Sequence, residues 1–226
     1  MSQQHGIDGV LEGFRRFQDR YFTEDSELFD RLRHGQTPKM LVVSCCDSRV
    51  DPLLMTGCEP GDLFVVRNVA NLVPPCEDHQ HETHHSVSAA LEFGVRYLEV
   101  EHIVVLGHAG CGGIRSLCEG AGHTHDSYLG KWLSIAEPAR ERVQHALPDS
   151  DFETQVAACE RASILVSLEN LLTFPWVSER IEKGTLALHG WYFDIHSGAL
   201  EGVDLASGEF RPLVNSPLPV DSADSN

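Results

Sequence analysis

Basic residues are scarce in this sequence of 226 residues, in which 17 Lys and Arg stand against 34 Asp and Glu and give a formal net charge of −17. Nucleic acids and anionic membrane surfaces both favour partners with clustered Lys and Arg. The chain also lacks an apolar run of the roughly 18 residues that a membrane-spanning helix needs. The composition therefore argues against nucleic acid and against a membrane as partners.

Features of secreted proteins are missing as well. Residues 1–10 do not show the basic and then apolar pattern of a secretory signal peptide, so we expect a cytoplasmic protein. The seven cysteines are an odd number in a chain of this length and do not indicate a disulfide framework. In a reducing compartment, some cysteines of an enzyme are candidates for metal ligation or catalysis, and others are small buried hydrophobes.

Strand-like and helix-like segments alternate along the chain. Short apolar, β-branched runs typical of buried parallel strands lie at 40–44, 63–66 and 103–106, with a later strand over 185–195. Helical spacing is found over 7–33, as two helices, and over 87–97 and 152–172. A hairpin is expected at Ser197-Gly198, before a short strand near 202–205.

This alternation predicts an α/β fold with a mostly parallel central sheet flanked by helices. The length fits one domain, 1–226, with an N-terminal helical arm over 1–35 and a loosely ordered tail over 215–226.

Metal-ligating side chains follow two of the predicted strands. Cys45 ends the first, and His108 and Cys111 directly follow the third. Ligands of parallel α/β sheets bind beyond the carboxyl ends of the strands, so both motifs are expected at one edge of the sheet. Two thiolates and one imidazole suit a tetrahedral Zn²⁺ site and leave one position for water. Either motif alone is more simply explained by packing, but together they favour a zinc site.

Two charged residues lie beside the first of these cysteines. Asp47 could ligate the metal and close the site, or Arg49 could hold it away so that it accepts a hydrogen bond from metal-bound water. The alternative is a surface ion pair of little energetic value. That alternative fits poorly with a neighbouring metal site.

At these residues the sequence resembles the β-carbonic anhydrase family. Its C-x-D-x-R motif matches Cys45, Asp47 and Arg49, and its H-x-x-C motif matches His108 and Cys111. The resemblance extends from about residue 36 to 213 and includes the segments 59–62, 67–71 and 189–191.

The resemblance implies one Zn²⁺ per chain on Cys45, His108 and Cys111, with Asp47 and Arg49 as the catalytic dyad. It implies a carbonic anhydrase (carbonate dehydratase), a lyase that hydrates carbon dioxide reversibly to bicarbonate and a proton by attack of zinc-bound hydroxide. It also implies a homodimer or a larger assembly of dimers.

The family's substrate pocket has counterparts in this chain. Gln36 matches a residue that binds substrate across the dimer interface in the plant-like branch. Phe64 and Val69 match apolar pocket residues, and Phe93 occupies a position that is often Tyr.

A second branch of the family has an inhibitory bicarbonate pocket made by a Trp, an Arg and a Tyr. Arg67 matches the Arg, but Val42 and Phe193 replace the other two residues, so we do not expect this pocket.

Other readings stay open from the sequence alone. Relatives of this fold hydrolyse carbon disulfide or carbonyl sulfide with the same ligands, and a non-catalytic, zinc-stabilised binding protein is a further alternative. The loop containing His79, His81, His84 and His85 is interpreted as solvated rather than as a proton shuttle or second metal site, and His123 and His125 are interpreted in the same way.

Overall fold

The computed structural model describes residues 6–24, 26–77, 86–120 and 127–218. Two compact units divide the chain between Thr37 and Pro38. Our single-domain organisation stays a prediction. The histidines at 79–85, His123 and His125, and all but the first four residues of the expected tail lie outside the described residues.

The N-terminal unit is helical. It contains α1 (Ile7–Gln18), a π-helical turn (Asp19–Glu24) and α2 (Ser26–Leu32). The π-helical turn and α2 are held together by aromatic rings, because Phe29 packs edge-on to Tyr21 with ring centroids 5.7 Å apart and stacks on Phe22 at 4.8 Å. Two helices were predicted here, and the irregular turn between them was not.

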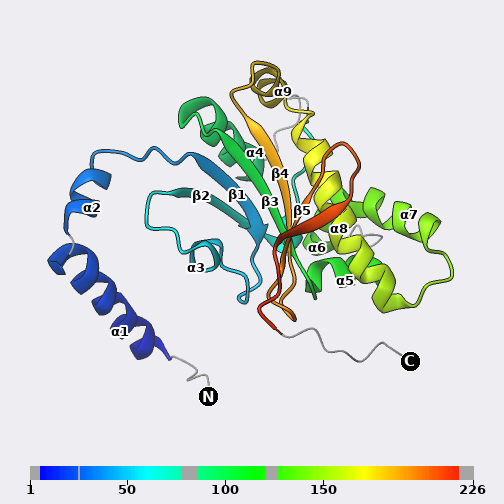
Figure 1. The fold of residues 1–226 in the computed structure, drawn as a ribbon, viewed down its shortest axis with the longest axis horizontal. Coiled ribbons are helices and arrows are strands. Elements are labelled where there is room, and N and C mark those ends of the chain that lie inside the picture. Colours follow the sequence, from blue (N-terminus) through cyan, green and yellow to red (C-terminus); the bar gives the residue numbers. More distant parts are fainter. Residues whose placement is uncertain (1–5, 25, 78–85, 121–126, 219–226) are drawn as a thin grey trace. The chain divides into compact units, whose positions relative to one another are not determined.

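The larger unit is built on one six-stranded sheet with the order β2-β1-β3-β4-β5-β6. The first four strands in that order pair in parallel and the last two pair antiparallel, as Figure 1 shows. The strands are β1 (Met40–Cys45), β2 (Leu63–Asn68), β3 (His102–His108), β4 (Ala187–Phe193), β5 (Leu200–Val203) and β6 (Phe210–Val214). This arrangement confirms the predicted mostly parallel α/β fold.

Helices connect the parallel strands and lie on either side of the sheet. They are α3 (Pro52–Thr56), α4 (Ser86–Glu92) with its π-helical continuation (Phe93–Tyr97), α5 (Gly112–Cys118), α6 (Tyr128–Leu133), α7 (Glu137–Ala146), α8 (Phe152–Leu171) and α9 (Pro175–Glu182). Short 3-10 turns lie at Val69–Asn71 and Ser134–Ala136. The long helix predicted over 152–172 is confirmed.

The core forms because side chains of β1 and β3 alternate between the two faces of the sheet. Leu41, Val43, Ile103 and Val105 are fully buried and pack in one cluster with apolar residues of α4, α8 and α9. Val104 belongs to a smaller cluster on the opposite face. Because β1 and β3 are central strands with apolar clusters on both faces, Cys45 and His108 at their ends are held in fixed positions.

Glycines let α8 approach the sheet closely. A Cβ on Gly107 would lie 2.7 Å from Ile164 Cδ1, and one on Gly190 would lie 2.8 Å from Ile164 Cγ2. No other residue type fits at either position without movement of Ile164. The two glycines therefore set the depth at which α8 lies on β3 and β4.

Candidate metal centre

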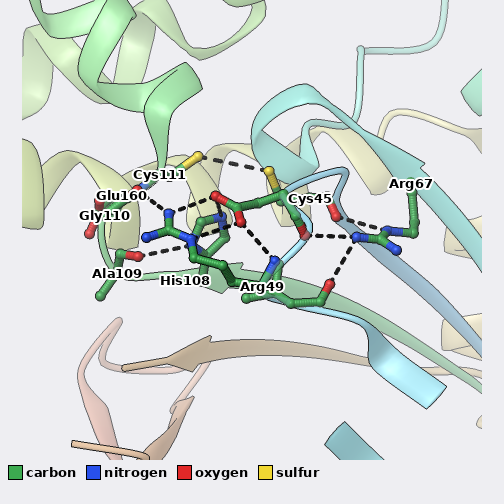
Figure 2. A network of polar contacts seen from close by, with 10 residues as sticks. Cys45, Arg49, Arg67, His108, Ala109, Gly110, Cys111 and Glu160 are labelled. Carbon is green, nitrogen blue, oxygen red and sulfur yellow. Dashed lines mark hydrogen bonds and ion pairs between the residues drawn. The ribbon is translucent and has the colours of Figure 1, made fainter. Parts of the chain in front are cut away.

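The three predicted ligands meet at the carboxyl edge of the sheet. Cys45 is the last residue of β1 and His108 the last of β3, and these strands are parallel neighbours. Cys111 follows immediately before α5. The two sulfurs lie 4.0 Å apart, and the ligand atoms of all three residues lie within 4.8 Å of one another. Figure 2 shows the side chains of Cys45, His108 and Cys111 gathered at this edge.

The ring of His108 is oriented for ligation. Its Nδ1 lies 2.9 Å from the carbonyl oxygen of Ala109, which fixes the tautomer that carries the proton on Nδ1. Its Nε2 is buried and has no hydrogen-bond partner among the described residues. A buried nitrogen lone pair beside two sulfurs is costly unless it is satisfied, and a cation satisfies it.

The donor set fits zinc. Thiolate and imidazole ligands that lie close together in a buried site are typical of Zn²⁺. Three protein ligands leave the fourth coordination position open for water. Within the residues that the structure describes, this is the single group of three or more His, Cys, Asp or Glu side chains close enough to hold an ion. Cys45, His108 and Cys111 would hold the metal.

The two thiols are strongly coupled. A hydrogen bond from Cys111 lowers the pKa of Cys45 to about 4. The same bond, together with burial, raises the pKa of the Cys111 thiol. A metal ligand must be a thiolate, so a cation that binds here displaces the protons of both cysteines and gains two thiolate ligands.

Asp47 borders the metal site and is held by Arg49. The guanidinium donates two hydrogen bonds to the carboxylate, from Nε at 2.9 Å and from Nη2 at 2.7 Å. The same Nη2 donates to the carbonyl oxygen of Gly110 at 3.0 Å, as Figure 2 shows for Arg49 and Gly110. Asp47 Oδ2 lies 4.0 Å from His108 Nε2. One arginine thus ties the carboxylate to the loop that carries His108 and Cys111.

The bonds from Arg49 set the charge of this carboxyl group. They hold the pKa of Asp47 well below its ordinary value, against the opposing effect of burial. The pKa of Arg49 is raised by the same contact. Asp47 therefore stays an acceptor throughout the neutral range.

Arg67 supports the loop after β1. Its Nε donates to the carbonyl oxygen of Cys45 at 3.0 Å, and its Nη2 donates to the carbonyl oxygen of Asp47 at 2.8 Å. Its Nη1 pairs with the Asp51 carboxylate at 3.0 Å. The backbone that presents both Cys45 and Asp47 is therefore fixed by hydrogen bonds from one partly exposed guanidinium.

Two of the predicted pocket residues contact each other. The rings of Phe64 and Phe93 have centroids 5.8 Å apart, and Phe93 is 45% exposed. Val69 precedes Ala70, and its carbonyl oxygen accepts a hydrogen bond from Trp132 Nε1 at 2.7 Å. Gln36 belongs to the N-terminal unit. Substrate binding by these four residues stays a prediction.

Sequence reasoning missed Glu160, although it touches the centre. Its Oε1 accepts a hydrogen bond from the backbone N–H of Cys111 at 2.9 Å, and only 3% of the residue is exposed. The signal was its place in α8, because Val156 and Ile164, one turn away on either side, are buried apolar residues. A carboxylate on the buried face of a helix indicates a specific partner.

No helix in the described ranges combines the length and the apolar character needed to cross a bilayer.

Comparisons with known proteins agree with this geometry. A family model described as carbonic anhydrase matches residues 40–200. The chain is 42% identical, over 218 residues, to a protein named β carbonic anhydrase 5, chloroplastic, of Arabidopsis thaliana; the match covers 95% of this chain and 71% of that protein.

Solved structures are similar as well. The chain superposes on the β-carbonic anhydrase CcaA with a TM-score of 0.84 and 33% identity, which covers 92% of this chain and 94% of that chain. It superposes on a β-carbonic anhydrase of Sordaria macrospora, described as tetrameric, with a TM-score of 0.66 and 28% identity, which covers 91% and 92% of the two chains.

Proposed function

The chain belongs to the β-class of the carbonic anhydrase family, and from this membership we propose that Asp47 and Arg49 are the catalytic dyad of its zinc centre. The enzyme is a carbonate dehydratase that interconverts carbon dioxide and bicarbonate. One observation carries the proposed dyad. Arg49 donates two hydrogen bonds to the carboxylate of Asp47, and an oxygen of this carboxylate lies 4.0 Å from Nε2 of His108.

Each member of the dyad has a distinct task. When bound, Zn²⁺ acidifies a water molecule and so supplies a nucleophile at neutral pH. Asp47 accepts a hydrogen bond from the attacking oxygen and orients it toward the carbon of the substrate. Arg49 keeps Asp47 ionised and away from the ligand position, because both oxygens of the carboxylate are bonded to its guanidinium.

The substrate is small and apolar, and we assign its approach to Phe64, Val69 and Phe93. Gln36, supplied by a second copy of the chain, would donate a hydrogen bond to a substrate oxygen. Phe93 carries no hydroxyl, so this position adds packing but no further hydrogen bond.

We assign the enzyme to the plant-like branch without the inhibitory bicarbonate pocket. Val42 and Phe193 offer no hydrogen-bonding side chain where that pocket needs Trp and Tyr. The donors of Arg67 are occupied by backbone carbonyls and Asp51, which leaves this guanidinium engaged in structure.

We propose a homodimer or a larger assembly of dimers, with residues 1–35 as the N-terminal helical arm of a single domain. One face of α1 presents Val10, Leu11 and Phe14, each at least half exposed, to solvent. A relative of solved structure is described as tetrameric. Our predicted compartment remains the cytoplasm, although one relative is named chloroplastic.

The dyad is tested by Asp47→Ala with stopped-flow hydration of carbon dioxide and zinc analysis of both proteins. We expect full zinc content and a hydration rate lower by about 10²-fold or more, since an oriented proton acceptor contributes at that scale. Full zinc with an undiminished rate would refute the role of Asp47.

Two further measurements on the same protein preparation distinguish the alternative functions. Carbon disulfide hydrolysis measured beside carbon dioxide hydration distinguishes the sulfur-substrate hydrolases. Zinc content without any hydration, even at alkaline pH, would identify a binding protein.

A further inference from the structure

A buried network links the metal centre to α8 and to β4. Glu160 lies in α8, and both of its carboxylate oxygens accept hydrogen bonds. Oε1 accepts from the backbone N–H of Cys111 at 2.9 Å, and Oε2 accepts from the hydroxyl of Tyr192 at 2.8 Å. Figure 2 shows Glu160 next to Cys111.

The partner of Glu160 is itself fixed. Tyr192 lies in β4 and is 3% exposed. Burial and the negative charge of Glu160 raise the pKa of the Tyr192 phenol, so that it remains a donor. The guanidinium of Arg161 lies over the Tyr192 ring at 3.8 Å and donates to Glu201 at 3.0 Å. The phenol therefore has little freedom to turn away from Glu160.

Besides the bond from Arg49 to Gly110, backbone N–H groups attach both ends of the ligand loop, residues 109–111, to the body of the fold. The backbone N–H of Ala109 donates to the carbonyl oxygen of Phe193 at 2.9 Å, which anchors the side of the loop near His108. Glu160 anchors the other side at Cys111 itself. Folding alone does not call for a carboxylate in this position, because an apolar side chain would bury without the desolvation cost of a charge.

We propose that Glu160 is a positioning residue that fixes the zinc ligand Cys111 through its backbone N–H, and that Tyr192 holds Glu160 in place. This inference rests on the proposed zinc centre. Partners that orient a metal ligand in this way commonly change metal affinity or activity about 10- to 100-fold when they are removed. Glu160 touches neither substrate nor metal, so its effect must appear in how firmly the ion is held.

The test compares zinc release to a chelator in the zinc-loaded full chain and its variants. We expect Glu160→Ala to release zinc about 10- to 100-fold faster than the wild type. We expect Glu160→Gln to remain within about tenfold, because its amide oxygen still accepts from Cys111 and its amide nitrogen donates to the Tyr192 oxygen. Equal release from wild type and Glu160→Ala would overturn the proposal.

Ser167→Ala is the matched control for a purely structural effect. Ser167 lies in the same helix, is fully buried, and its hydroxyl accepts a hydrogen bond from the backbone N–H of Val73 at 3.2 Å. Removing it takes away a comparable buried bond far from the ligands in sequence. We expect it to lower the thermal midpoint while zinc release stays at the wild-type rate. If Ser167→Ala released zinc as fast as Glu160→Ala, the effect would be one of general stability and the proposal would be wrong.

Tyr192→Phe keeps the test decisive where Glu160→Ala does not fold. It leaves Glu160 in place but removes one of its two donors, so we expect faster zinc release with an unchanged circular dichroism spectrum. An unchanged rate would contradict the role given to Tyr192 and Glu160. A wild-type protein that binds no zinc would instead sink the proposed function, so the two failures are distinct.

Discussion

At the scale of single residues, Arg49 joins two segments that are distant in sequence. It binds the Asp47 carboxylate after β1 and the Gly110 carbonyl oxygen between the two ligands that follow β3. The carboxylate is mostly covered, whereas the arginine side chain is 53% exposed. Solvent therefore screens the ion pair, and its net contribution to stability is about 1 kcal/mol or less. The ion pair instead keeps the Asp47 carboxylate ionised and fixes its orientation beside the metal centre.

The lowered pKa of Asp47 predicts a pH dependence of stability. A carboxyl group whose pKa is depressed in the folded state stabilises the fold above its unfolded pKa, near 3.9, and loses this effect as the pH falls toward the folded value. We expect Asp47→Asn to unfold at a lower temperature than the wild type at pH 7, with a gap that narrows below about pH 4. Thermal unfolding of both metal-free proteins measures it, so that acid release of zinc does not contribute. A gap that widened toward acid would contradict the assignment.

The ligands of this centre could be predicted from the sequence because strand ends place them. A residue that ends a parallel strand has one possible edge to occupy, which is why Cys45 and His108 could be brought together before the structure was known. Glu160 could not, because its role depends on which backbone N–H group the turn before α5 presents to α8. That contact depends on how closely α8 packs against the sheet, which the spacing of residues in the sequence does not reveal.

At the scale of elements, the close approach of α8 to the sheet depends on glycine. A Cβ on Gly190 would meet side-chain carbons of Val203, Ile164 and Leu168 at 2.7, 2.8 and 2.9 Å. These three side chains belong to β5 and α8, so one added methyl group presses on both of these elements at once. Since interiors are close-packed, neither neighbour can give way freely.

We expect Gly190→Ala to lower the free energy of unfolding by about 1–3 kcal/mol, the usual cost of overpacking a core. Chemical denaturation of the two proteins at equal zinc content checks it. Gly112→Ala is the control, since a Cβ there has no neighbour within 4 Å. Similar losses in both variants would show that steric contact is not the cause.

Some elements escaped sequence analysis for identifiable reasons. The last strand, β6, contains Pro212, and proline weakens the prediction of a strand. The proline is tolerated because β6 is the edge strand and pairs on one side, with β5. The π-helical turn at Phe93–Tyr97 also went unpredicted, since its apolar residues still follow helical spacing. The hairpin expected at Ser197-Gly198 is confirmed between β4 and β5.

At the scale of the whole molecule, α1 carries an apolar face that is largely exposed. Ile7, Val10, Leu11 and Phe14 recur at helical spacing, and all four are at least half exposed. A second copy of the chain is the occupant that our proposed assembly supplies.

We therefore expect Leu11→Asp with Phe14→Asp to weaken dimerisation by tenfold or more, because burying one such side chain contributes about 1.5–3 kcal/mol. Sedimentation equilibrium over a range of protein concentrations measures the dissociation constant. Arg16→Glu on the same helix changes the net charge equally and should leave assembly intact. Dimers of undiminished stability in the double variant would place the interface elsewhere.

Cys45 and His108 end two strands that are hydrogen-bonded neighbours, and adjacent strands lie about 4.8 Å apart. The spacing of the sulfur and nitrogen donors is therefore set by the main-chain pairing of these two strands. Such a cradle resembles a rigid chelator more than a zinc finger, whose chain collapses around its metal. We therefore expect ions of similar size and tetrahedral preference to exchange in this site without unfolding of the sheet.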